Sequence, residues 1–194
     1  MQPNPIHALS VKQPTVVGFR VLWICVLVAA ALFLNSCGFR LQGATPMPFE
    51  TLLMKVPENS AFGADLRRAL RAASPGTRLI EDPSEPYDAA LQQVAETRTA
   101  REVSLNAQGR VEEYELTLTY TFNVVSADGE IILPNTTLRA VRNLPFDDQV
   151  VQAKEGEQAT LFKQMQSSLV SRIVRQVSSP NVAQRYAELK TNGK

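Results

Sequence analysis

Histidine and cysteine are almost absent from this sequence of 194 residues, and the few that occur lie at its beginning. The one histidine is His7, and the two cysteines are Cys25 and Cys37. The chain after Cys37 therefore offers no imidazole general base, no thiol nucleophile and no ordinary zinc or haem ligand set. Its glycines form no phosphate-binding or dinucleotide-binding motif, and no nucleophile-elbow sequence occurs. These absences exclude the common classes of enzyme.

Charge is nearly balanced, with 20 Lys and Arg residues against 19 Asp and Glu and a formal net charge of +1. A general nucleic-acid binder would carry a strong basic excess, so we expect no nucleic-acid partner. The composition is typical of a globular protein, with 44% hydrophobic and 20% charged residues. Adjacent carboxylates such as Glu112 and Glu113 point to opposite faces of a strand and do not converge on a substrate. We predict a protein that is not an enzyme, with no catalytic residue, no metal site and no cofactor.

The first 36 residues have the pattern of a secretory targeting segment. Lys12 and Arg20 are its only charges, and no acidic residue occurs before Glu50. An unbroken apolar run of 14 residues follows, from Val21 to Leu34. This run is short for a membrane span, which takes about 20 helical residues, and it matches the apolar core of a signal peptide. The alternative is an uncleaved N-terminal anchor helix.

Leu34-Asn35-Ser36-Cys37 stands where the cleavage site would be, and it resembles a bacterial lipobox. The resemblance implies that Cys37 becomes the first residue, with a covalent diacylglycerol on its sulfur and an N-acyl chain on its amine. Each buried methylene contributes about 0.8 kcal/mol, so three chains would hold the protein firmly on a membrane. Gly38 follows, not the aspartate that such systems read as an inner-membrane retention signal. The implied location is the outer membrane, lipid-anchored on the periplasmic side.

Removal of residues 1–36 leaves 18 basic and 19 acidic side chains, so the remaining chain has a net charge of −1. It divides into a lipidated cysteine with its tether over 37–48, a domain over 49–178 and a polar tail over 179–194. The elements that the sequence predicts are a strand over 49–56, a helix from a cap at Asn59 or Ser60 to Ala73, a possible short strand over 77–80, strands over 87–105, 110–125 and 130–142, a helix from a cap at Asp147 or Asp148 to Val177, and a possible short helix over 182–189.

The strand over 110–125 has the clearest pattern. Its even-numbered residues from Tyr114 to Val124 are apolar, and the odd-numbered ones between them are polar. A period of two means one buried and one polar face. The strand over 87–105 alternates poorly, so we expect a bulge there. The order strand-helix-strand-strand-strand-helix predicts an α+β two-layer sandwich, with two helices packed on one face of a four-stranded, mostly antiparallel sheet.

Three motifs together resemble one family. They are Cys37-Gly-Phe-Arg-Leu41 after the targeting segment, Ser104-Leu-Asn-Ala-Gln-Gly-Arg-Val-Glu-Glu-Tyr-Glu-Leu116 around the predicted hairpin, and Ala153-Lys-Glu-Gly-Glu-Gln158 at the start of the long helix. In this order they resemble the LptE family of lipopolysaccharide-assembly lipoproteins, over roughly 37–177. The resemblance implies a non-catalytic protein that sits as a plug inside an outer-membrane β-barrel translocon of the LptD type, helps to assemble that barrel and contacts lipopolysaccharide. The alternative is a periplasmic lipoprotein of another lipid-transport or envelope-assembly machine without a barrel partner.

Basic side chains are the natural contacts of phosphorylated lipopolysaccharide. Lys154 is the first candidate, because it matches the basic position of the family motif that opens the long helix. Arg110 beside the hairpin turn is a weaker candidate, and Arg142 on the fourth strand is weaker still. The threonine-rich face of the 110–125 strand fits the polar lumen of a wide barrel, and it equally fits an ordinary solvent-exposed sheet face.

Overall fold

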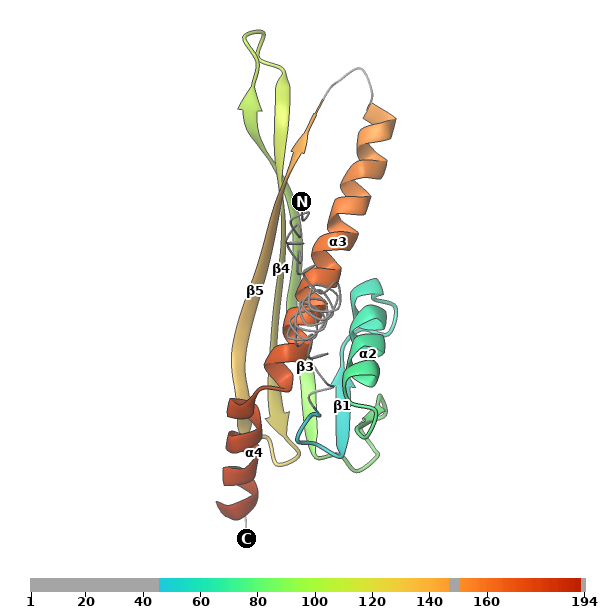
Figure 1. Cartoon of the computed structure of the whole chain (residues 1–194), viewed down its shortest axis with the longest axis vertical. Helices are drawn as coiled ribbons and strands as arrows, with labels where there is room; N and C mark the ends of the chain where they lie inside the picture. The colour runs from blue at the N-terminus through green and yellow to red at the C-terminus, as the bar shows by residue number, and fades with distance from the viewer. Residues whose placement is uncertain (1–45, 147–150, 193–194) are drawn as a thin grey trace, which may run out of the picture. The chain divides into compact units, whose positions relative to one another are not determined.

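One mixed sheet of five strands carries the fold in the computed structural model of the chain, which describes residues 46–146 and 151–192 (Figure 1). The described residues belong to one compact unit, Ala44–Lys194. The targeting segment and Cys37 lie outside the described residues. The strands are β1 (Thr51–Lys55), β2 (Arg78–Ile80), β3 (Ala89–Leu105), β4 (Val111–Ser126) and β5 (Ile131–Pro145), in the spatial order β2-β1-β3-β4-β5.

The prediction of four mostly antiparallel strands was wrong in number and partly in direction. β1 lies parallel to both β2 and β3, whereas β3, β4 and β5 are antiparallel to their neighbours. The fifth strand is β2, which pairs with β1 through Thr51 opposite Arg78. A strand of three residues is too short to show a period of two, so the sequence indicated it only as a possibility.

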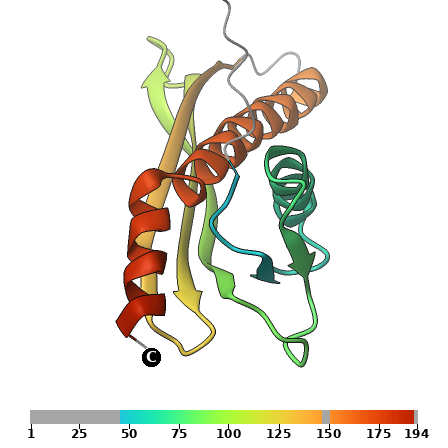
Figure 2. The ribbon, with the colours of Figure 1, turned by 60° about the horizontal axis from the view of Figure 1, so that its bottom comes forward.

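Within the described residues three helices, not two, accompany the sheet. α2 (Ala61–Ala73) begins after Ser60, whose Oγ accepts a hydrogen bond from the Gly63 N–H at 3.1 Å, so the expected cap is confirmed at Ser60. α3 (Val151–Val177) is the long helix, and its expected caps Asp147 and Asp148 lie outside the described residues. α2 and α3 pack beside each other on one side of the sheet (Figures 1 and 2).

The segment expected to be a polar tail, with a possible short helix over 182–189, forms the third helix, α4 (Pro180–Asn192). Val182 and Tyr186 on this helix are buried, and the Tyr186 ring meets Phe49 edge-on with its centroid 4.9 Å away. These apolar residues lie four apart among polar ones, a spacing that is too sparse to predict a packed helix.

The hairpin of β3 and β4 is the longest element of the sheet. The expected bulge in β3 is confirmed, because the pairing with β4 shifts between Gln93 and Ala95 and leaves Val94 out of register. Both turns that flank β4 contain a glycine with positive φ, 75° at Gly109 and 86° at Gly129. Such backbone angles strain other residues, so these two glycines fix the ends of β4.

The core lies between the sheet and the two helices on its covered side. The even-numbered residues of β4 from Leu116 to Val124 are fully buried, as the alternation predicted. The Tyr120 ring stacks on Phe62 of α2 with a centroid distance of 4.0 Å, and its hydroxyl donates to Gln93 Oε1 at 3.1 Å. Burial, with a smaller effect from Glu96, raises the pKa of Tyr120 far above its ordinary value, so this phenol stays neutral.

The two faces of β4 predict different sensitivities to substitution. Phe122 has no exposed surface, so Phe122→Ala should lower the free energy of unfolding by about 3–5 kcal/mol through lost burial and a cavity. Thr119→Ala on the opposite face should cost much less. Chemical unfolding of both variants measures the difference, and equal losses would show that the faces are assigned wrongly.

Candidate functional site

The sheet face opposite α2 and α3 is polar along its three long strands. Register places six threonines on it, which we call the threonine face: Thr97 and Thr99 of β3, Thr117, Thr119 and Thr121 of β4, and Thr137 of β5. All six are exposed or half-buried. Their hydroxyls and the neighbouring side chains bond across strands, with Thr121 Oγ1 2.9 Å from Thr137 Oγ1 and Arg139 Nη2 donating to Thr117 Oγ1 at 3.2 Å. Around the six threonines this face offers hydroxyl groups, whereas nearer the β4–β5 turn it carries the exposed Ile131 and a small apolar cluster of Leu53, Ile80 and Ala90.

Charge on this face is neutralised locally. The Glu115 carboxylate lies 3.3 Å from the Arg101 guanidinium on β3 and 3.8 Å from the Arg139 guanidinium on β5. One carboxylate thus holds two cations from neighbouring strands. A face of hydroxyls and paired charges can rest against a polar surface with few charges left unpaired.

The three predicted lipopolysaccharide contacts come from three elements at one end of the unit. The β3–β4 hairpin tip, the end of β5 and the start of α3 all lie at the upper end of Figure 1. Arg110 precedes β4 and follows the turn that Asn106 organises, because Asn106 Oδ1 accepts from the N–H groups of Gln108 and Arg110. Arg142 is exposed on β5 opposite Leu116. Arg110 and Leu116, the residue opposite Arg142, are six residues apart along the chain, which corresponds to roughly 20 Å in a strand. Arg110 and Arg142 therefore do not form one cluster.

Lys154 is better placed than the other two. It lies in the first turns of α3, and its Nζ is 2.8 Å from Glu157 Oε2 in an ion pair between side chains three residues apart. Its side chain is 20% exposed, whereas that of Glu157 is 47% exposed. A lysine held in position by one exposed carboxylate can exchange that partner for a phosphate, which is the stronger acceptor of charge-assisted hydrogen bonds.

A cleft of about 500 Å³ runs between β3 and α3, lined by Arg98, Glu155, Gln158, Ala159 and Phe162. The Arg98 guanidinium lies 5.8 Å from the centre of the Phe162 ring and donates to Glu96 Oε1 and to Gln166 Oε1, at 2.8 and 2.9 Å. Gln166 in turn donates to Asp65 of α2 at 2.5 Å. Arg98 is therefore a structural cross-link between the hairpin and both helices, and its Nε and Nη2 donors are already engaged.

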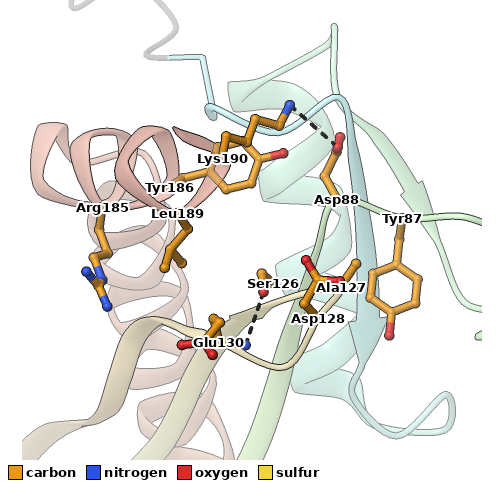
Figure 3. Close-up of a pocket in the computed structure, with 10 residues that line it drawn as sticks. All are labelled: Tyr87, Asp88, Ser126, Ala127, Asp128, Glu130, Arg185, Tyr186, Leu189 and Lys190. Atoms are coloured by element: carbon orange, nitrogen blue, oxygen red, sulfur yellow. Dashed lines mark hydrogen bonds and ion pairs between the residues drawn. The ribbon is translucent and has the colours of Figure 1, made fainter. Parts of the chain in front are cut away.

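A second groove, of about 760 Å³, lies at the other end of the sheet between α4 and the β4–β5 turn. Figure 3 shows Tyr186 and Lys190 reaching from α4 toward Asp88, with Asp128 and Glu130 on the turn. Asp88 Oδ2 accepts from the N–H groups of Glu50 and Thr51, both at 2.9 Å, and Lys190 Nζ lies 3.9 Å from Asp88 Oδ1. This carboxylate thus joins β1, β3 and α4.

The pKa of Asp88 is lowered even though partial burial alone would raise it. The N–H groups of Thr51 and Glu50, the Tyr186 hydroxyl and the Lys190 charge all favour the ionised form and outweigh the burial. Burial raises the pKa of the Tyr186 phenol, so the hydroxyl keeps the proton with which it can donate to Asp88. The polar contacts in this groove hold α4 in place. Its side chains do not present a nucleophile and a base that converge on one point.

Within residues 46–146 and 151–192, no group of three acidic, cysteine or histidine side chains is arranged to hold a metal ion. None of the helices in this part of the chain is long and apolar enough to cross a membrane. Sequence reasoning missed the Arg98–Gln166–Asp65 cross-link and the role of Asp88. Neither has a local signal, because Gln166 lies 68 residues from Arg98 and Asp88 lies 38 residues from Glu50.

Comparison with known proteins gives consistent matches. The family model described as LptE, lipopolysaccharide-assembly, matches residues 49–177. The protein named LPS-assembly lipoprotein LptE from Pectobacterium atrosepticum is 26% identical over 166 residues, which cover 84% of this chain and 88% of that protein. Its namesake from Photorhabdus laumondii is 26% identical over 170 residues, which cover 85% of this chain and 87% of that protein.

Solved structures support the same fold. An uncharacterized lipoprotein B from Nitrosomonas europaea, solved in solution by NMR, has a TM-score of 0.63 and 30% identity, covering 79% of this chain and 96% of that one. The rare lipoprotein B from Shewanella oneidensis has a TM-score of 0.54 at 20% identity, covering 73% of this chain and 97% of that one. The latter likeness concerns the fold alone.

The contacts of Asp88 predict a pH-dependent stability. Because its folded-state pKa is lowered, its contribution is complete above the unfolded value of about 3.9 and is lost as the pH falls through the folded value. Asp88→Asn should lower the free energy of unfolding by about 1–2 kcal/mol at neutral pH, and by less in acid. Thermal unfolding across pH measures this. Asp128→Asn, at an exposed position in the same groove, is the control, and a loss at Asp88 that does not vary with pH would contradict the assignment.

Proposed function

The chain belongs to the LptE family of lipopolysaccharide-assembly lipoproteins, and from this membership we propose that it plugs the outer-membrane β-barrel that delivers lipopolysaccharide to the cell surface, and helps to assemble it. The family resemblance seen in the sequence motifs is thereby confirmed. The family is non-enzymatic and acts in lipopolysaccharide assembly, in agreement with the predicted lack of catalysis. The barrel partner of the LptD type, the plug position and direct contact with lipopolysaccharide belong to the proposal.

The threonine face is the observation that supports a plug. The lumen of a wide membrane barrel is polar, and a body seated in it needs a surface that hydrogen-bonds without large apolar groups. Six threonines and the paired charges around Glu115 provide such a surface on the uncovered side of the sheet. The opposite sheet face is buried under α2 and α3, so the side chains that stabilise the fold are separate from those available to a partner.

Membrane attachment through Cys37 completes the proposal. We place a diacylglycerol and an N-acyl chain on Cys37 and the domain on the periplasmic side of the outer membrane, on the strength of the lipobox-like segment Leu34-Asn35-Ser36-Cys37. Matches to curated lipoproteins agree with this assignment. The intact mass of the protein purified from membranes reports the first residue and the acyl chains directly.

Lipopolysaccharide contact is assigned first to Lys154, then to Arg110, then to Arg142. All three come from elements at the end of the unit where the hairpin projects, and among the described residues the Lys154 ammonium pairs with the exposed Glu157 carboxylate. A bound phosphate would take the place of Glu157 at the Lys154 ammonium. Arg110 and Arg142 lie at different levels of the sheet, so each would meet a different part of a large ligand.

Purification from detergent-extracted membranes tests the function. The tagged protein should retain a large β-barrel protein, because a plug buries much of its surface in its partner. Lipopolysaccharide should be present in the same complex. Recovery of the lipoprotein with periplasmic components but no barrel would support the alternative envelope machine and overturn the plug.

Charge reversal at Lys154 tests the ligand contact. Lys154→Asp removes the cation and leaves a residue that suits the first turns of a helix, so the helix should keep its stability. Binding of detergent-dispersed lipopolysaccharide should fall by about tenfold, as expected for the loss of one charge-assisted contact. Lys55→Asp, at an exposed cation on β1, is the control and should bind normally. Unchanged binding in Lys154→Asp and Arg110→Asp alike would refute a basic contact at this end.

A further inference from the structure

The outer side of the helix layer carries an excess of positive charge. α3 has no acidic residue from Gln158 to Val177, and it exposes Lys163, Arg172 and Arg175 over that length. α2 adds the exposed Arg68 and Arg71 and has Asp65 as its one acidic residue. We call the five exposed cations the cationic helix surface. The charges are concentrated here although the chain after residue 36 has a net charge of −1.

Three of these cations have no partner in the described part of the protein. The side chains of Arg71, Lys163 and Arg175 make no hydrogen bond and no ion pair with any residue of 46–146 or 151–192. Arg68 pairs with Asp65, and Arg172 donates to the Arg139 carbonyl oxygen at 2.9 Å. Cations at the end of a helix can balance its dipole, which accounts for Arg71 and Arg175 in the last turns. Lys163 lies in the middle of α3, where the dipole does not favour it.

The two helices present these cations together. Gln166 of α3 donates to Asp65 of α2, which fixes the helices beside each other, and Figure 2 shows them side by side. Leu66 and Leu70 of α2 and Met165 and Leu169 of α3 are buried in the core, so the exposed cations lie on the sides of the helices away from it.

The chain enters the domain next to this surface. The Met47 N–H donates to Ser74 Oγ at 3.1 Å, and Ser74 is the C-cap of α2, three residues after Arg71. Ten residues separate Met47 from Cys37, and an extended chain of that length spans at most about 35 Å. A membrane anchor at Cys37 would therefore keep the C-terminal end of α2 within about 35 Å of the bilayer surface.

We infer that, before the domain is seated in the barrel, the cationic helix surface lies on anionic phospholipid headgroups of the leaflet that holds the lipid anchor, and so orients the domain on the membrane. This inference rests on the lipid attachment of the proposed function. Clustered Lys and Arg side chains are attracted to anionic lipid within about a Debye length of the surface, and the attraction falls with added salt. The lipid anchor provides the affinity for the membrane, and the cations determine which side of the domain faces the lipid.

Site-specific quenching tests the orientation on the acylated protein. After Cys37 is acylated the mature chain has no free thiol, so a dye can be placed at Gln164→Cys on the exposed side of α3 or at Thr119→Cys on the threonine face. The labelled proteins are reconstituted in phosphatidylcholine vesicles with or without phosphatidylglycerol, each with a headgroup-linked quencher. Phosphatidylglycerol should increase quenching at position 164 several-fold, should not change it at position 119, and should lose this effect at high salt.

Charge reversal supplies the matched comparison. Arg71→Glu, Lys163→Glu and Arg175→Glu combined should abolish the phosphatidylglycerol effect at position 164. The same three reversals at the exposed Lys55, Arg78 and Arg185 change the net charge equally and should leave it intact.

Three outcomes would overturn the inference. Equal quenching at position 164 in both kinds of vesicle, or equal loss in both triple variants, would show that these cations do not meet lipid. Shielding of position 164 only when a barrel partner is present would place the surface against protein. If the protein purified from cells carries no acyl groups and stays in the aqueous phase, the anchor itself is refuted. If the protein is anchored but its quenching does not depend on phosphatidylglycerol, this inference alone is refuted.

Discussion

The burial of alternate side chains of β4 beneath α2 and α3 is the constraint on which the rest of the structure depends. Leu116, Leu118, Tyr120, Phe122 and Val124 have no exposed surface, and together they form the centre of the core. Because a strand alternates its side chains, this burial commits the residues between them to the opposite face. The threonine face is thus a direct consequence of the core, and a shift of one residue in register would destroy both. The proposed partner surface is as rigid as the strand that carries it.

Polar side chains then fix the two layers relative to each other. Arg98 of β3 reaches Gln166 of α3, and Gln166 reaches Asp65 of α2, so one line of hydrogen bonds ties the hairpin to both helices. At the other end Asp88 ties α4 to β1. The first cross-link fixes the middle of α3, the helix that carries Lys154, relative to the hairpin. The proposed lipopolysaccharide contact by residues from separate elements requires this fixed geometry.

Much of the fold could be predicted where a pattern is local and long enough. The alternation over eleven residues of β4, the Ser60 cap and the poor alternation that signals the β3 bulge are all of this kind. β2 is three residues long, and the buried side chains of α4 are too sparse for a clear helical period. Whether these two segments form a strand and a packed helix is therefore decided by strand pairing and by packing on the core, which the sequence pattern does not display. The same holds for the sites. Lys154 is proposed from a family motif and stays a prediction, whereas the contacts of Asp88 depend on groups far away in the chain.

The sheet has a buried face and a proposed partner face. The central claim, that the threonine face contacts a β-barrel, can therefore be measured directly. A photoreactive amino acid at position 119 of the threonine face, and another at position 164 of the helix layer, would be cross-linked in intact cells. The account predicts that position 119 forms its main adduct with a large outer-membrane β-barrel protein. Adducts of position 119 with periplasmic proteins only, while the lipoprotein is folded and lipid-anchored, would contradict it.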